Sequence, residues 1–287
     1  MKKLAWMLSV LPLFSGCYFG ERLPAEMIMT SESRPLEKEK TLESEVRFDI
    51  GSLEITGSNK PGELYSYDLE YDKAGFAPEV RYNTAVDGTE GRFFFSLETR
   101  HHSGIHGQRL NNRLRLALND ALPLRLRINA GVGNARLSLS GLKVSSIDFE
   151  SGVGEAKLSA YEPNAVRCEH IRLKSGVGRF EATGLGNMNF GELEFDGGVG
   201  GASLDFTGAW QQNADIRIRV GVGGVNVRIP RDIGVKVDSE KNLLSGLHLE
   251  GFNKQDEYYY SENYDTAATR VLIRVTTGIG GLRIGWI

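Results

Sequence analysis

One tripeptide, Gly-Val-Gly, occurs five times between residues 131 and 223, and its spacing restricts the folds open to this chain. Consecutive copies begin 21 to 24 residues apart, and an altered sixth copy, Gly-Ile-Gly, lies near the C-terminus. A nearly constant period of this length is typical of a solenoid, in which each repeat stacks on the one before it. The glycines of the six copies are Gly131, Gly133, Gly152, Gly154, Gly176, Gly178, Gly198, Gly200, Gly221, Gly223, Gly278 and Gly280.

Apolar residues alternate with polar ones on both sides of each tripeptide. In the first copy, Leu126 and Ile128 precede the glycines and Leu137 follows them. Alternation with a period of two predicts strands that bury one face, and glycine permits a sharp corner between two such strands. Two strands and a return loop in about 22 residues predict an all-β fold, namely a single-stranded parallel β-helix-like solenoid with Gly-Val-Gly corners.

The outward positions before each tripeptide carry charges whose sign alternates from repeat to repeat. Because neighbouring strands lie about 4.8 Å apart, stacking in register would place opposite charges side by side. Chance alternation is the competing explanation, and the agreement of two columns argues against it. We expect two charge ladders, in which each exposed pair contributes about 0.2–1 kcal/mol. The first is Arg127, Asp148, Arg172, Glu194 and Arg217, and the second is Glu150, Lys174, Asp196 and Arg219. The alternation fails in the column after the tripeptides, which is Arg136, Lys157, Glu181, Ser203 and Asn226.

The composition of the 287 residues is that of an ordinary folded protein, with 40% hydrophobic and 25% charged residues. The formal net charge is −3, and no basic stripe is present, so we expect no nucleic-acid partner. The repeats predict one β-solenoid domain over 44–287. Its parts are irregular N-terminal rungs over 44–123, regular rungs over 124–229, and C-terminal rungs over 230–287 with an insertion at 253–265.

The N-terminal residues have the pattern of an export signal. Two lysines precede an apolar stretch of 11 residues, Leu4 to Phe14, which is too short to span a bilayer. The following Ser-Gly-Cys resembles a bacterial lipobox, which predicts removal of signal peptide 1–16 and lipidation of Cys17. An ordinary secretory signal with a chance cysteine is the alternative. Residues 17–43 are polar and aperiodic, which predicts a solvated tether.

Two groups of residues are candidate binding sites. His101, His102 and His106 lie within six residues of one another, and imidazole binds zinc, nickel or copper. No carboxylate or cysteine completes a ligand set, so we expect a solvated loop and no metal or other cofactor. The second group, Tyr258, Tyr259, Tyr260 and Tyr264, could stack against a sugar or peptide, or could cover the open end of the solenoid.

Two stretches resemble known families. The sequence Arg-Phe-Asp-Ile-Gly-Ser-Leu at 47–53, with Leu-Pro-Leu at 122–124 and a corner at Leu142, is similar to the toast-rack family. Gly-Val-Gly at 221–223, followed by Ile-Pro-Arg-Asp-Ile-Gly-Val at 229–235, is similar to the C-terminal domain of LiaF-like cell-wall-active antibiotic response proteins and to putative-adhesin β-solenoids. The resemblance covers about 46–287. It implies a membrane-attached β-solenoid without known catalytic residues, and some LiaF-like members modulate envelope stress sensors.

These observations favour a lipid-anchored binding or structural module of the cell envelope, adhesin-like and without catalytic activity. The alternatives are a regulator in an envelope-stress pathway and a glycan-active β-helix enzyme. We expect the partners to be the membrane, through the lipid, and an envelope protein or cell-wall glycan. The location would be the outer membrane if the cell has two membranes.

Overall fold

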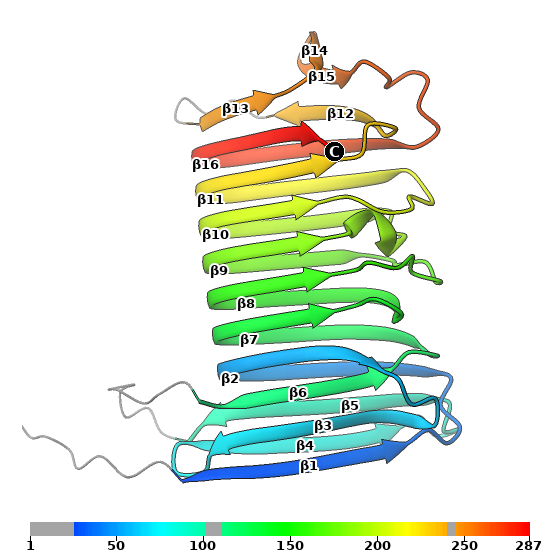
Figure 1. Cartoon of the computed structure of the whole chain (residues 1–287), viewed down its shortest axis with the longest axis vertical. Coiled ribbons are helices and arrows are strands. Elements are labelled where there is room, and N and C mark those ends of the chain that lie inside the picture. The colour runs from blue at the N-terminus through cyan, green and yellow to red at the C-terminus, as the bar shows by residue number, and fades with distance from the viewer. Residues whose placement is uncertain (1–25, 101–110, 240–244) are drawn as a thin grey trace, which may run out of the picture.

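The computed structural model describes residues 26–100, 111–239 and 245–287, and it confirms the expected all-β class. Sixteen strands form one continuous sheet that winds into a tall two-layered stack (Figure 1). The helical content of the described residues is one 3-10 turn, η1 (Leu185–Met188). The strands are β1 (Met27–Pro35), β2 (Thr41–Ser58), β3 (Glu63–Asp72), β4 (Phe76–Thr84), β5 (Glu90–Thr99), β6 (Arg113–Asn119), β7 (Pro123–Ser138), β8 (Lys143–Ser159), β9 (Ile171–Thr183), β10 (Glu192–Asp205), β11 (Ala214–Ile229), β12 (Gly234–Ser239), β13 (Ser245–Leu249), β14 (Phe252–Gln255), β15 (Tyr258–Ser261) and β16 (Arg270–Trp286).

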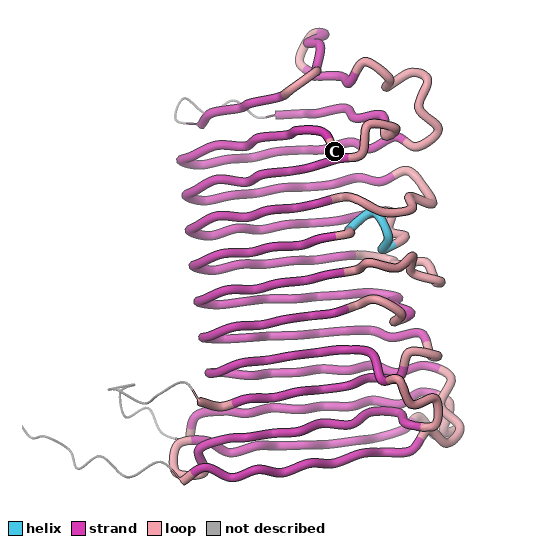
Figure 2. Tube along the Cα trace, viewed as in Figure 1, coloured by secondary structure: helices cyan, strands magenta, loops and turns pink. Residues whose placement is uncertain are grey.

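The middle of the stack consists of long strands that pair in parallel, in the order β7, β8, β9, β10, β11 and β16. Each strand runs along one layer, turns and returns along the other layer (Figure 1), and its tripeptide lies in the interior of the strand, as in β7 and β8. The loops between strands gather along the opposite side from these corners (Figure 2). We call the layer before the tripeptides the first-half sheet and the layer after them the second-half sheet.

The tripeptides pair in register from one strand to the next. For example, Val132 pairs with Val153 and Gly133 with Gly154. The second glycine of each copy has a φ between +134° and +141°, a region that disfavours residues with a Cβ atom. In addition, a Cβ atom on Gly223 would collide with the carbonyl oxygen of Gly200 in the strand below. Glycine at this position is therefore required by both the backbone conformation and the close approach of the corners.

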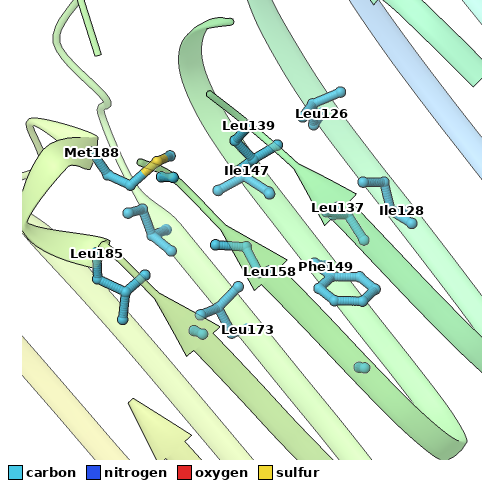
Figure 3. Close-up of a cluster of buried hydrophobic side chains, with 14 of the residues drawn as sticks. Leu126, Ile128, Leu137, Leu139, Ile147, Phe149, Leu158, Leu173, Leu185 and Met188 are labelled. Carbon is cyan, nitrogen blue, oxygen red and sulfur yellow. The ribbon is translucent and has the colours of Figure 1, made fainter. Parts of the chain in front are cut away.

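The core lies between the two layers and consists of the alternating apolar residues on either side of the corners. Figure 3 shows that side chains such as Leu126 and Leu137 come from the two halves of one strand and project into the same interior. Phe149, Phe180 and Phe195 form a row across three strands, with ring centroids 5.9 and 5.2 Å apart. The buried face of each rung thus packs against its own return half and against its neighbours.

The N-terminal end differs from the prediction of a tether over 17–43. Strand β1 pairs with β3 in antiparallel orientation and β2 begins at Thr41, so 27–35 and 41–43 belong to the sheet. The polar sequence of β1 misled the prediction, because an edge strand need not bury a full apolar face. The halves of β2 pair separately with β5 and β6 on the side away from β7.

The C-terminal end also corrects the expected order of rungs. Strand β16 is last in the sequence, but it lies between β11 on one side and β12 and β13 on the other. The expected insertion at 253–265 contains a hairpin of β14 and β15, and β15 extends the first-half sheet beyond β12. At both ends, therefore, most of the capping strands lie in the sequence between two rungs that are neighbours in space: β3 to β6 between β2 and β7, and β12 to β15 between β11 and β16.

Candidate binding surfaces

The charge ladders predicted from the sequence lie on the outer side of the first-half sheet. Glu194 pairs in register with Arg172 and Arg217 and lies 2.7 Å from the Arg217 guanidinium. Asp148 lies 3.2 Å from Arg172. In the second ladder, Asp196 lies 2.5 Å from Arg219. The register of both ladders is confirmed, and most charges of this face therefore have a partner within the protein.

The first ladder extends beyond the residues that the sequence indicated. Glu45 on β2 pairs with Arg127 in register, and their charged atoms lie 3.4 Å apart. At the other end, Arg217 faces Arg274 on β16, which breaks the alternation. Arg274 forms its ion pair with Asp215 instead. The pairing of β2 with β7 was hidden by the 64 residues between them, so Glu45 could not be recognised from the repeat.

The second-half sheet carries an open groove of about 660 Å³ near the C-terminal end of the stack. It crosses strands β9, β10, β11, β16 and β13, and we call it the C-terminal groove. Its floor contains one glycine from each of four neighbouring strands, which pair in register: Gly201, Gly224, Gly281 and Gly246. The corresponding positions on β7, β8 and β9 carry side chains, namely Asn134, Glu155 and Arg179. The groove is therefore a column of missing side chains in an otherwise covered face.

Polar side chains border this floor. Ser203, Asn226, Arg283 and His248 form the next outward column on the same four strands, and Arg179 lies at the end nearer the middle of the stack. Two residues before the floor glycines are the exposed corner residues Val199, Val222 and Ile279. The floor thus runs between a polar column and an apolar ridge.

The groove has an excess of positive charge. Glu181 also lines it, but its carboxylate lies 3.2 Å from Lys157, which binds Glu155 as well at 3.1 Å. Arg179 and Arg283, by contrast, form no ion pair with the residues in the described ranges. Their guanidinium groups are available to an external anion.

A second groove of about 650 Å³ lies on the same sheet at the N-terminal end. Two of its four acidic groups form ion pairs, since Glu63 lies 3.3 Å from Lys60 and Glu54 lies 3.6 Å from Arg115. The other two, Glu32 and Asp68, accept hydrogen bonds from hydroxyl groups. In the lining of this groove, burial raises the pKa of Tyr67 to about 12, helped by the carboxylate of Glu32, which accepts a hydrogen bond from the Tyr67 hydroxyl. This groove therefore has an excess of negative charge, the opposite of the C-terminal groove.

A buried carboxylate lies in the layer formed by β2, β5 and β4. Glu39 is 6% exposed and accepts hydrogen bonds from the Tyr82 hydroxyl at 2.5 Å and from the backbone N–H groups of Glu37 and Lys38. Burial alone would raise the pKa of Glu39, but these hydrogen bonds outweigh it, so the pKa lies below its ordinary value. Burial likewise raises the pKa of Tyr82.

The four candidate tyrosines divide between two environments. Tyr259 packs against the hydrophobic core at the end of the stack, as a capping residue would. Tyr258, Tyr260 and Tyr264 form an edge-to-face cluster, with successive ring centroids 6.4 and 5.2 Å apart. The Lys236 ammonium lies 3.7 Å from the Tyr258 ring centroid, so this ring face is already occupied. Whether the cluster binds a ligand stays a prediction.

Cys17, His101, His102 and His106 lie outside the described residues. Cys168 is fully buried, and burial raises the pKa of its thiol to about 12, as expected for a packed and unreactive side chain.

The described parts of the chain contain no group of three metal-binding side chains. In these same ranges, no helix has the length and hydrophobicity needed to cross a membrane.

Solved structures with a similar arrangement come from several bacteria. A putative cell adhesion protein from Clostridium sporogenes is 20% identical, with a TM-score of 0.49, and the match covers 91% of this chain and 100% of that one. A putative adhesin from Bacteroides fragilis is 15% identical, with a TM-score of 0.40 and coverages of 90% and 97%. A putative lipid binding protein from Parabacteroides distasonis is 9% identical, with a TM-score of 0.35 and coverages of 90% and 96%. No curated protein matches the chain significantly.

Two family models match the sequence and together span nearly all of the described strands. Residues 24–183 match the N-terminal domain of toast_rack, which is more than half of the chain. Residues 180–284, which include most of the C-terminal groove, match the C-terminal domain of the cell wall-active antibiotics response protein LiaF. The chain therefore belongs to the toast-rack/LiaF-like family.

Proposed function

We propose that this protein is a non-catalytic, adhesin-like binding module of the cell envelope. In this proposal, a lipid on Cys17 attaches it to a membrane, and the C-terminal groove is its binding site. The observation that carries the proposal is the groove itself, in which unpaired guanidinium groups border an empty column of the sheet. The family match to a cell-wall response domain over the same residues supports it.

The position of the groove suits a surface that is displayed away from a membrane. Residues 18–26, between Cys17 and the first strand, can span at most about 30 Å. The groove begins six strand spacings from β1 and ends ten spacings from it, about 29 and 48 Å at about 4.8 Å per strand. Rungs of about 22 residues with Gly-Val-Gly corners would make this stack a rigid solenoid spacer. If the cell has two membranes, the residue after Cys17, Tyr18 rather than aspartate, favours the outer one.

The anchor is tested by mass spectrometry of the mature N-terminus. We expect a diacyl or triacyl group on Cys17, and a Cys17→Ser variant that is not lipidated. An unmodified Cys17, or cleavage at another position, would remove the anchor from the proposal.

The binding site is tested by photo-cross-linking in intact cells. A photoreactive amino acid at Asn226, in the groove, is compared with one at Arg136, which occupies the same outward column on β7 outside the groove. We expect a reproducible covalent adduct from position 226 and none from position 136. Equal labelling at both positions, or no labelling at either, would contradict the assignment of the groove.

A second function, regulation of the response to envelope stress, is favoured by the LiaF match over 180–284. Its partner would be an envelope protein rather than a cell-wall glycan. Deletion of the gene should then change the induction of envelope-stress genes by a cell-wall antibiotic. A deletion strain with normal induction would leave the binding module as the better explanation.

A further inference from the structure

We propose that the C-terminal groove binds an acidic glycan chain, which lies across the strands along the four floor glycines. This assignment rests on the proposed function and specifies its ligand. It is supported by the shape of the groove, by glycines that the fold itself does not need, and by the position of the unpaired charges.

The shape of the groove fits a linear ligand rather than a compact one. It spans four strand spacings, from β9 to β13, which is about 19 Å. The backbone hydrogen-bonding groups of β10, β11 and β16 are used within the sheet, since each of these strands pairs on both sides. A peptide therefore cannot join the sheet on this face as an added strand, and a ligand must bind through side chains and surface contact.

Three of the four floor glycines are not explained by the needs of the fold; at the fourth, Gly281, an added Cβ would meet the carbonyl oxygen of Gly246 at 3.3 Å. Gly223, in the corner, has positive φ and collides with its neighbour if given a Cβ atom. The next residue, Gly224, does not have positive φ, and its added Cβ would meet only the carbonyl oxygen of Gly281 at 3.8 Å. At Gly201 an added Cβ would meet no atom within 4 Å. Glycine inside a strand weakens it, and it often marks a bulge, a tight bend, or a site where another backbone or a ligand approaches closely. At Gly201 and Gly224 no other backbone comes closer than 3.8 Å to the added Cβ, which favours a ligand.

The charges indicate an anionic ligand of some length. A guanidinium group binds carboxylate, sulfate or phosphate oxygens with two parallel hydrogen bonds. Arg179 on β9 and Arg283 on β16 are three strand spacings apart along the stack, about 14 Å, so a ligand with anionic groups a similar distance apart can place one on each guanidinium. Between them, Ser203 and Asn226 present a hydroxyl and an amide, which are groups that hydrogen-bond sugar hydroxyls. A glycan whose acidic groups are separated by hydroxyl-bearing sugar rings would match the order of these side chains along the groove.

The test uses the full-length lipidated protein in detergent and isothermal titration calorimetry. The probes are oligogalacturonate, a chondroitin sulfate oligosaccharide and phosphorylated mannan, with cellohexaose, hexaglutamate and inorganic phosphate as comparisons. We expect saturable binding of at least one acidic glycan, with affinity that falls as the salt concentration rises. Binding should be at least tenfold weaker for cellohexaose, hexaglutamate and phosphate.

Variants locate this binding in the groove. The double substitution Gly201→Thr with Gly224→Thr should keep the melting temperature of the wild type, or raise it, and weaken glycan binding at least tenfold. Gly201→Ala with Gly224→Ala serves the same purpose if the threonines disturb folding. Arg179→Ala with Arg283→Ala should weaken binding and reduce its salt dependence, whereas Arg136→Ala, outside the groove, should change neither.

The outcomes separate the ligand class from the proposed function. Tight binding of cellohexaose, which is uncharged, would contradict the requirement for an acidic ligand. Binding of hexaglutamate with the same affinity as the acidic glycans would favour an acidic peptide. If no acidic glycan binds but position 226 still cross-links in cells, the groove stands as a binding site and the glycan assignment falls. If binding is present but the glycine variants do not alter it, the ligand does not occupy the floor.

Discussion

The two sheets of this protein are made from the same strands, yet their outer faces differ. On the first-half sheet, charges alternate along the stack and pair with one another, as Glu194 does with Arg217. On the second-half sheet, Arg136 and Lys157 are neighbours of the same sign, and the strands after Glu181 present glycine, Ser203 and Asn226. A face whose charges are satisfied internally serves register and stability. The second-half sheet, with unpaired cations around an empty column, is the face to which we assign the proposed binding site.

The largest effect should come from comparing two adjacent glycines on β11. Gly223→Ala places a Cβ in a disfavoured φ region and against the carbonyl of Gly200, so it should destabilise the protein by about 3 kcal/mol or more. Gly224→Ala has open space and ordinary φ, and should change stability by less than about 1 kcal/mol, with stabilisation the expected sign. Urea denaturation monitored by circular dichroism measures both. Similar losses would mean that the floor glycines are structural, which would remove the contrast between corner and floor.

A smaller effect on stability is expected at Glu39, near the N-terminal end of the stack. Its carboxylate is buried, whereas the carboxylates of the charge ladders are partly exposed to water. Glu39→Gln should cost about 2 kcal/mol at neutral pH, because it replaces a charged acceptor of several hydrogen bonds. Since the pKa of Glu39 is lower in the folded chain, its contribution is present above about pH 4.5 and is lost as the pH falls below that value. The variant should therefore lose less stability than the wild type between neutral pH and acid. Parallel stability curves in urea at several pH values would contradict this origin.

The smallest effect concerns the ladder itself. Glu194→Arg would place a cation between Arg172 and Arg217, costing about 1–2 kcal/mol at low salt and less at high salt. Ser203→Arg, on the second half of the same strand, is the control and should change stability by less than about 0.5 kcal/mol. Melting temperatures at two salt concentrations measure the difference. If both variants behave alike, the ladder does not distinguish the two faces energetically.

Much of the central stack was predictable because two local signals agree. Alternation with a period of two assigns each residue to the inside or outside, and the corner glycines set the offset between repeats. Together they lead to the observed pairing of Arg127 with Asp148 and of Glu194 with Arg217. The ends were harder to predict, because β1 and β15 have antiparallel partners and no corner. The candidate groove was missed, although a third glycine directly follows the tripeptide in the last three copies, at Gly201, Gly224 and Gly281.

The sequence by itself determined the all-β class, the inward and outward faces and the register of neighbouring repeats, because these depend on contacts between residues about one repeat apart. Only the tertiary structure decided which distant segments close the stack. Strand β16 inserts between β11 and β12, and β2 lies beside β7, because an exposed strand edge must be covered by whatever segment can reach it. The groove also depends on the tertiary structure, because its last two residues, Gly246 and His248, come from β13, a strand that carries no repeat motif. Its shape and charge exist only once these separate strands have stacked.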